Sequence, residues 1–319
     1  MKCPDNMPKK KAPMNRSLSL IKGDTLKYAE RLIVLKKKAV VIEIIDKTIN
    51  QDLFQVIPLL PDNFIDLLFI DPPYNLRKNF NNKLFREKSI NEYAEWIESF
   101  IEPMLRCLKP NASVYVCGDW KSSTSLHLVL SKYFIVKNRI TWERDKGRGS
   151  HTNWKNNTED IWFCTRNRDY TFNPESVKLK RKVLAPYRDN NGEPKDWKNS
   201  ENGAFRLTHA SNIWNDISIP FWSMPENTDH PTQKPEKLLA KIILASSNNG
   251  DIVFDPFLGS GTTSVVAKKL GRRFVGVELD KSYACITEKR LELAENDGSI
   301  QGFYEGVFWE RNSNPKRRV

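Results

Sequence analysis

Residues 252–263 read IVFDPFLGSGTT, an apolar run followed by an acid and a glycine-rich turn. A short continuous apolar run is typical of a strand buried on both faces of a parallel sheet. A helical pattern follows over residues 263–270, with Gly271 at its end. Residues 274–277 are apolar again. The order strand, turn, helix, strand predicts an α/β fold with a doubly wound, mostly parallel sheet.

A second apolar run that ends in an acid lies toward the N-terminus, where residues 67–74 read LLFIDPPY. Behind it, Ser89 and Glu92 form a capping-box pair at the start of a helix with apolar residues at helical spacing. Lys109-Pro110-Asn111 is expected to separate that helix from the next strand. Further elements are expected as strands at residues 113–117, 134–142 and 161–165 and as a helix beginning at Pro235.

The composition bounds the class of protein. The 319 residues are enough for one large domain or two small ones. A net charge of +12 favours a polyanionic partner, although many basic proteins bind no nucleic acid. No apolar run reaches the ~20 residues of a membrane span, and the basic start lacks the apolar core of a signal peptide, so we expect a cytoplasmic protein. The five cysteines and four histidines show no metal-ligand spacing, so no metal site is expected.

The glycine-rich turn indicates a cofactor loop. Gly259 and Gly261 permit a tight turn and let a ligand approach the backbone. Glu278 closes the next strand, where an acid can accept both ribose hydroxyls of a nucleoside. Asp255 would repel a pyrophosphate and attract an amino group, so the combination suits S-adenosylmethionine better than NAD. The alternative is a plain turn with solvated acids.

The tetrapeptide Asp71-Pro72-Pro73-Tyr74 indicates a site for an exocyclic amine. Two prolines fix two φ angles, which makes the loop rigid. The Asp71 carboxylate and the loop carbonyls can then hold both N–H groups of the amine, and Tyr74 offers a ring on which a base can stack. The alternative is a simple turn. Its position at the end of a buried strand favours function, because ligands bind at those ends.

Together these segments resemble the beta class of amino DNA methyltransferases, the N4/N6 DNA methylases of restriction–modification systems. That class carries a D/N/S-P-P-Y/F/W tetrapeptide first, then a variable stretch, then an F-x-G-x-G loop, and the same order occurs here. TQKP at residues 232–235 resembles its T-x-K-P signature. Residues 50–52 and 60–63 resemble its opening segment, with Gln51 where glycine is usual. The match spans about residues 49–293.

The resemblance implies a circularly permuted S-adenosylmethionine-dependent methyltransferase fold with a target-recognition insertion, and S-adenosylmethionine as cofactor. The implied catalytic residues, which hold the target base, are Asp71, Pro72, Pro73 and Tyr74. The implied cofactor-binding residues are Asp52, Asp71, Thr232, Lys234, Asp255, Phe257, Gly259, Gly261, Thr262 and Glu278. The implied segments are a basic arm (1–47), a catalytic half (48–165), a target recognition region (166–228), a cofactor-binding half (229–295) and a C-terminal tail (296–319).

The segment 166–228 has no clean period and is rich in charged and aromatic residues, so it reads as an irregular insertion at one edge of the sheet. Its cations suit phosphate contact, although a solvated face is an equal alternative. A second basic strip around Arg148 could close over a flipped base. The expected DNA-binding residues are Lys178, Lys180, Arg181, Lys182 and Arg148.

In this family an Asp-Pro-Pro-Tyr tetrapeptide usually accompanies N6-adenine methylation, and a Ser-Pro-Pro-Tyr tetrapeptide usually accompanies N4-cytosine methylation. The resemblance therefore implies direct methyl transfer to the N6 amino group of adenine in double-stranded DNA, with N4-cytosine as the alternative. RNA and protein glutamine methyltransferases usually carry the two motifs in reverse order. A non-catalytic DNA-binding protein is the alternative of a different class, but it would need neither the acid nor the glycines. The implied setting is the prokaryotic cytoplasm at the nucleoid, with a cognate restriction endonuclease as a candidate partner.

Overall fold

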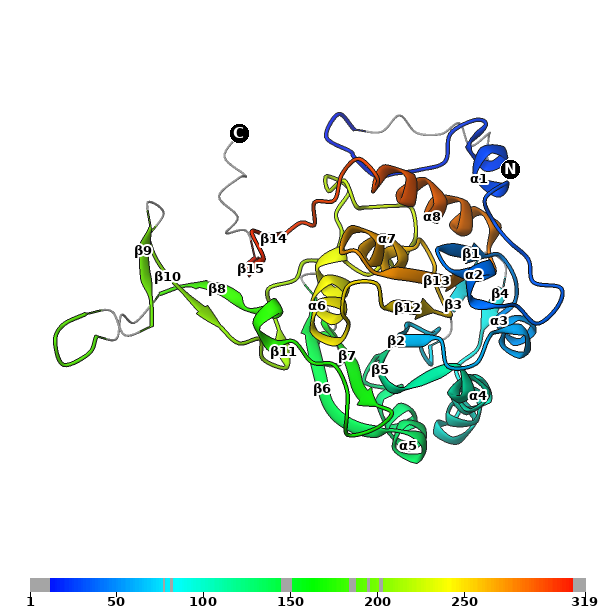
Figure 1. The fold of residues 1–319 in the computed structure, drawn as a ribbon, viewed down its shortest axis with the longest axis horizontal. Helices are drawn as coiled ribbons and strands as arrows, with labels where there is room; N and C mark the ends of the chain where they lie inside the picture. The colour runs from blue at the N-terminus through cyan, green and yellow to red at the C-terminus, as the bar shows by residue number, and fades with distance from the viewer. Residues whose placement is uncertain are drawn as a thin grey trace.

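A central eight-stranded sheet organises the computed structural model, which describes residues 12–76, 78–80, 83–144, 151–183, 188–193, 196–200 and 203–311 (Figure 1). The strand order is β1-β13-β12-β2-β5-β7-β6-β11. The pairs from β1 to β5 are parallel, β7 is antiparallel to β5 and β6, and β11 is parallel to β6. The doubly wound, mostly parallel sheet is therefore confirmed. The strands are β1 Lys47–Ile49, β2 Ile65–Ile70, β5 Leu108–Gly118, β6 Ile135–Glu143, β7 Thr158–Thr165, β11 Ile213–Trp214, β12 Ile252–Asp255 and β13 Arg273–Val277.

Helices cover both faces of this sheet. Side chains of β2 alternate between two apolar cores: Leu68 and Ile70 lie in one, with residues of α3, α4 and α5, and Leu67 and Phe69 lie in the other, with residues of α6 and α7. Helix α8 packs beside α7 and against α1. The α-helices are α1 Asp24–Ala29, α2 Val41–Ile44, α3 Leu53–Val56, α4 Ile90–Met104, α5 Ser123–Tyr133, α6 Glu236–Ser246, α7 Thr262–Lys269 and α8 Lys281–Leu293. Short 3-10 helices occur at Ile57–Leu59, Leu105–Cys107 and Pro174–Val177.

The local predictions for α4 and β5 have different outcomes. The capping box is confirmed, since Ser89 caps the helix by accepting from the Glu92 amide and the Glu92 carboxylate accepts from the Ser89 amide at 2.8 Å. The expected break at residues 109–111 is wrong, because β5 already begins at Leu108. Pro110 is tolerated there because the pairing with β2 is irregular between Ile65 and Leu67, so the proline interrupts no regular ladder of hydrogen bonds.

A five-stranded sheet, here called the outer sheet, extends away from the body (Figure 1). Its order is β14-β15-β8-β10-β9. Segment 166–228, expected to be irregular, supplies three of these strands, and the expected C-terminal tail supplies the other two. Strand β15 pairs with β8 in parallel. The strands are β8 Leu179–Lys182, β9 Lys198–Ser200, β10 Gly203–Thr208, β14 Phe303–Tyr304 and β15 Val307–Trp309; a separate two-stranded ribbon joins β3 Lys78–Phe80 to β4 Lys83–Phe85.

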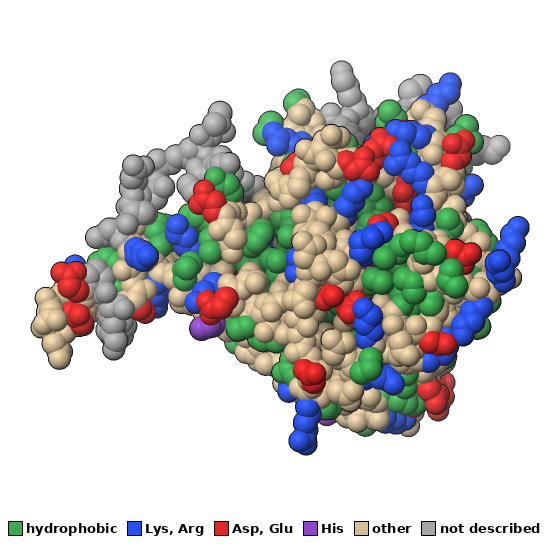
Figure 2. All heavy atoms as spheres, viewed as in Figure 1, with side chains coloured by type: hydrophobic (Ala, Val, Ile, Leu, Met, Phe, Trp, Pro, Cys, Tyr) green, Lys and Arg blue, Asp and Glu red, His purple; other side chains and the backbone are tan. Residues whose placement is uncertain are grey.

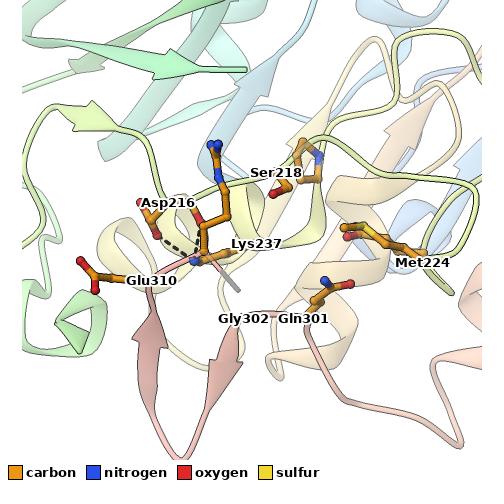
Figure 3. A pocket seen from close by; sticks show the side chains of 10 residues that line it. Asp216, Ser218, Met224, Lys237, Gln301, Gly302 and Glu310 are labelled. Carbon is orange, nitrogen blue, oxygen red and sulfur yellow. Dashed lines mark hydrogen bonds and ion pairs between the residues drawn. The ribbon is translucent and has the colours of Figure 1, made fainter. Parts of the chain in front are cut away.

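Two buried lysines of α6 connect the outer sheet to the body. Lys237 Nζ donates to the Asp216 carbonyl at 2.8 Å and also to the carbonyl of Trp309 at the end of β15. Lys241 Nζ donates to Asp216 Oδ1 at 2.7 Å. Burial lowers the pKa of Lys241 to about 8 despite the opposing effect of Asp216. Figure 3 shows Lys237 and Asp216 beside a small cavity of about 60 Å³ at this junction.

The segment before β1 is anchored on the body over its described part. The Arg16 amide donates to the Trp222 carbonyl at 2.7 Å, and the Leu18 amide donates to the Asn227 carbonyl at 2.7 Å. Lys27 beside α8 forms an ion pair with Glu292 at 2.6 Å. Among the helices of the described residues, none combines the length and apolarity needed to cross a membrane.

Candidate active site

Three acids predicted to be functional follow three neighbouring strands. Asp71 follows β2, Asp255 ends β12 and Glu278 follows β13. Because these strands are parallel, their carboxyl ends lie at one edge of the sheet, where ligands bind in open α/β sheets. A cavity of about 510 Å³ opens there, here called the edge cavity. Its size is within the range of small-molecule sites.

The Asp71-Pro72-Pro73-Tyr74 loop forms one wall of the edge cavity, and all four residues line it. The loop is held from outside by α4 and the start of α5. The Tyr93 hydroxyl donates to the Pro73 carbonyl at 2.9 Å, and the Asn75 amide donates to Ser122 Oγ at 3.1 Å. The predicted rigidity of the prolines is therefore supplemented by hydrogen bonds from two helices.

Both carboxylate oxygens of Asp71 are engaged. Lys234 Nζ donates to Oδ2 at 2.7 Å, and the Tyr74 hydroxyl donates to Oδ1 at 3.1 Å. Burial raises the pKa of Asp71, while the Lys234 ammonium opposes the rise. Burial disfavours the charge on Lys234, but Asp71 and Glu159 raise the pKa of that ammonium above its usual value. The cation and the carboxylate therefore stabilise each other inside the cavity.

Glu159 is a cavity carboxylate beside Asp71 that the sequence analysis missed. Its Oε2 accepts from the Tyr74 hydroxyl at 2.8 Å and lies 3.3 Å from Lys234 Nζ. Its Oε1 accepts from Arg144 at 3.0 Å. Strand β7 runs antiparallel to β5, so its beginning lies at the edge where the parallel strands end. An acid at the start of an antiparallel strand is the sequence signal, but the strand's direction has to be known first.

The residues of the glycine-rich turn fall into two groups: some line the edge cavity, and others hold the turn in shape. Gly259 and Phe257 line the cavity. Asp255, Gly261 and Thr262 are not among the lining residues. Asp255 accepts from the Phe257 amide at 2.9 Å and from a threonine hydroxyl of α7, and burial raises its pKa to about 7. It therefore holds the turn onto α7 from within the protein.

Position 261 requires glycine for two reasons. Its φ of +81° lies in the left-handed region, and a Cβ there would clash with the side chain of Thr287 on α8. Thr262 Oγ1 accepts from Arg290 of α8 at 2.9 Å. The turn thus packs against α8 as well as against its own helix.

Glu278 and Asp52 form another part of the wall of the edge cavity. Glu278 Oε2 accepts from the Gly259 amide at 2.7 Å, and Oε1 accepts from the Asp280 amide at 2.7 Å. Burial raises the pKa of Glu278 to about 7. Gln51, present where glycine is usual, bonds both backbone groups of Leu35, at 3.0 Å and 3.2 Å. The glutamine thereby connects the segment before β1 to this wall.

Thr232 and Lys234 also line the edge cavity, from the segment ahead of α6. Two further lining residues were missed. The rings of His230 and Tyr283 meet edge to face at 4.4 Å between centroids. An isolated histidine and an isolated tyrosine carry no spacing signal, so only the fold brings them to the site.

Four of the five expected DNA-binding residues, those between 178 and 182, lie on the outer sheet or next to it. Lys178 pairs with Glu175 at 2.6 Å, and Arg181 lies 3.7 Å from Glu310. Lys180 lies over the Trp309 ring at 4.3 Å from its centroid, and Lys182 is exposed. Arg148 lies outside the described residues. Figure 2 shows Lys and Arg side chains interspersed with Asp and Glu on the face in view, with no continuous basic stripe.

A doubly wound sheet with a glycine-rich turn, an acid after the next strand and an Asp-Pro-Pro-Tyr loop around one cavity defines a methyltransferase fold with a nucleoside-cofactor site. Comparison with known proteins gives the family. The chain belongs to the N6/N4 DNA methylase family, whose model matches residues 65–289.

Named relatives cover most of the chain. The chain is 34% identical over 255 residues to the DNA adenine methyltransferase YhdJ of Escherichia coli (strain K12), covering 78% of this chain and 83% of that protein. It is 33% identical to the type II methyltransferase M.HpaI of Haemophilus parainfluenzae, covering 74% and 71%. The crystal structure of an M1.HpyAVI–SAM complex superposes with a TM-score of 0.50 at 26% identity, covering 76% of this chain and 98% of that chain.

Proposed function

We propose that this protein is a site-specific DNA methyltransferase of a restriction–modification system that methylates the N6 amino group of adenine in double-stranded DNA. One observation carries the proposal: the Asp-Pro-Pro-Tyr loop and the cofactor turn line the same cavity. The relatives support the choice of base, because one is named a DNA adenine methyltransferase and another a type II methyltransferase.

The cofactor is S-adenosylmethionine, and the residues of the edge cavity fit it. Among the described residues, each oxygen of Glu278 accepts from one backbone amide, which leaves lone pairs for ribose hydroxyls. Thr232 and Lys234 supply donors for a carboxylate, and Phe257 supplies an apolar wall. When bound, S-adenosylmethionine supplies an electrophilic methyl group at its sulfonium centre.

The protein's own groups prepare the amine. Asp71 and the loop carbonyls accept the two N–H hydrogens of the exocyclic amino group, which favours a pyramidal nitrogen with an available lone pair. The Tyr74 ring supports the flipped base by stacking. The α4 and α5 contacts to the loop keep these acceptors in place, so little reorganisation is needed at the moment of transfer.

Target recognition is assigned in this proposal to segment 166–228, which forms most of the outer sheet. The sheet extends away from the body beyond the edge of the central sheet, as a surface that contacts flanking DNA would. A restriction endonuclease that cuts the same unmethylated site is the proposed partner, and chromosomal DNA at the nucleoid is the proposed place of action.

The test is expression in a host without amino-methylated bases, followed by genome sequencing with modified-base detection. The expected result is N6-methyladenine at one recurrent sequence motif, absent with the Asp71→Ala variant. N4-methylcytosine at a motif would overturn the choice of adenine. DNA binding without any modified base would favour the non-catalytic alternative. The proposed endonuclease partner is tested by asking whether the methylated DNA resists cleavage by a nuclease encoded beside the gene.

A further inference from the structure

The Tyr74 hydroxyl bridges two carboxylates. It lies 3.1 Å from Asp71 Oδ1 and 2.8 Å from Glu159 Oε2, and both contacts have hydrogen-bond geometry. A hydroxyl has a single hydrogen, so it donates to Asp71 or to Glu159 at any one moment, and it accepts from one of these acids only while that acid is protonated. Burial raises the pKa of Tyr74 well above its usual value, so the bridge is a neutral hydroxyl and not a phenolate.

The other contacts of the two acids give this bridge a direction. Asp71 Oδ2 is held by Lys234, which leaves the Tyr74 side of Asp71 for exchange of a proton. Glu159 is held on its far side by Arg144, whose side chain is 28% exposed. The path Asp71, Tyr74, Glu159 therefore runs from the loop that faces the target amine to a carboxylate beside the partly exposed Arg144, and a target base bound against the loop would close the direct route from Asp71 to solvent.

Amino methylation produces a proton that has to leave a buried site. The charged groups in contact around the bridge are Asp71, Glu159, Lys234 and Arg144, two carboxylates and two cations. A proton retained on either Asp71 or Glu159 would leave both cations with one carboxylate. Such an imbalance is costly in a buried site, so the proton has to leave this group of charges and pass to solvent.

We propose that Glu159 acts through Tyr74 as the outlet for the proton released by the methylated amine. The amino nitrogen forms its bond to the methyl carbon, and the bonding pair of the broken bond stays on sulfur. One N–H proton then passes to Asp71 Oδ1. As Tyr74 accepts this proton, its own proton moves to Glu159 Oε2, and Glu159 releases it to water. This inference rests on the proposed function.

The test is single-turnover transfer of a tritiated methyl group to DNA from a host without amino-methylated bases. Glu159→Gln retains an acceptor for Tyr74 but cannot take a proton, and Tyr74→Phe retains the stacking ring. Each is expected to lower the rate about 100-fold, the lower end of the range for proton transfer by a side chain. The double variant is expected to be no slower than either single variant, and cofactor affinity in calorimetry is expected to stay within about twofold.

Buffer rescue separates proton transfer from a structural role. In Glu159→Ala, formate, acetate and imidazole are expected to restore the rate in proportion to buffer concentration, and more strongly as the base strengthens. The matched control is Glu143→Gln, which changes an exposed acid beside Glu159 in the sheet and is expected to retain the wild-type rate.

Three results would each contradict the role of Glu159 as the proton outlet. They are an unchanged rate in Glu159→Gln, additive losses in the double variant, or a folded Glu159→Ala variant that buffers do not rescue. Circular dichroism and thermal melts establish folding, and the Gln variant decides if the Ala variant does not fold. A wild-type chain that methylates no DNA would contradict the proposed function itself, whereas wild-type transfer with an unaffected Glu159→Gln contradicts only the outlet.

Discussion

The edge cavity and the outer sheet use charge differently. In the cavity, Lys234 is 8% exposed and contacts two carboxylates that come from two different strands. On the outer sheet, Lys182 is exposed, and Lys180 has aromatic rings as its neighbours. Buried charges need partners at fixed geometry, whereas exposed charges can exchange water for phosphate. The first arrangement suits chemistry at one atom, and the second suits contact with a polyanion.

The largest effect expected is on Asp71, the cavity acid beside Lys234. Asp71→Ala removes an acceptor for the amine and leaves the Lys234 cation with Glu159 as its remaining carboxylate partner. Methyl transfer is expected to fall by about 10³-fold or more, while cofactor affinity stays nearly intact. Tritium transfer and calorimetry measure the two quantities separately. Substantial residual transfer would contradict the assignment of Asp71 and weaken the contrast with the outer sheet.

The next effect concerns the turn between β12 and α7. Gly261→Val combines strain at φ +81° with a clash against Thr287, so we expect a decrease of about 2 kcal/mol or more in the free energy of unfolding together with weaker cofactor binding. Gly250→Val is the matched control, since Gly250 has φ +84° and open space around a Cβ. In the control, the free energy of unfolding should fall by the cost of backbone strain alone, and cofactor affinity should match the wild type. Equal effects in denaturation and calorimetry would remove the role assigned to packing against α8.

A smaller effect is expected at Glu278, in another part of the cavity wall. Glu278→Ala leaves ribose hydroxyls unpaired, which should weaken cofactor binding by about 1–3 kcal/mol in calorimetry. If this variant binds the cofactor as tightly as the wild type does, another acid must bind the ribose hydroxyls. Asp52, which also lines the cavity, is the next candidate.

The raised pKa of Glu278 also predicts how the free energy of unfolding depends on pH. Its pKa rises from 4.5 to about 7 on folding, so the folded chain binds more protons between these pH values. The free energy of unfolding therefore falls as pH rises through this window. Glu278→Gln, which stays neutral, should reduce that slope in melts of the cofactor-free protein.

The smallest effect is expected on the outer sheet. Neutralising Lys178, Lys180, Arg181 and Lys182 should reduce the slope of log affinity against log salt by about 0.9 for each phosphate that the variant no longer neutralises, without changing cofactor affinity. The first three residues already have neighbours within the protein, so the expected reduction is smaller than four free cations would give.

The matched control removes equal charge from another surface. Lys36, Lys37, Lys38 and Lys47 are exposed and lie before β2. Their neutralisation should leave the salt slope nearer to wild type. If both quadruple variants show the same reduction in slope, general charge and not the outer sheet governs DNA binding, and the comparison between the two regions fails.

The sequence predicted six strands of the central sheet and the acids at the ends of three of them, because burial on both faces produces continuous apolar runs. The short strands β1 and β11 were not predicted. The sequence also predicted the two loops that meet in the edge cavity, because tight turns and rigid loops need glycine and proline. It could not assign Asp255 and Gly261 to the inside of the turn, since that depends on the packing of α7 and α8. Glu159 was missed for a related reason: only the antiparallel direction of β7 brings its beginning to the site.

The outer sheet was not predicted because its strands are short, charged and formed from distant segments. Leu179 is the buried residue of β8. A single apolar residue gives no alternation of apolar and polar side chains, which is the pattern that predicts a strand. Trp154, a large aromatic residue of the kind more often found in a core, is 93% exposed. It lies between β6 and β7, and no described element covers it.

The parallel pairing of β15 with β8 has a consequence for how new specificities arise. A gene exchange that imports a foreign segment 166–228 brings a new β8 but keeps the resident β15, whose Trp309 ring contacts Lys180 and whose carbonyl accepts from Lys237. Under the proposed assignment of target recognition to segment 166–228, specificity would depend on two separated pieces of the gene. A chimaera designed to recognise another DNA sequence should carry residues 296–311 from the same parent as residues 166–228, and it should lose stability when the two pieces come from different parents.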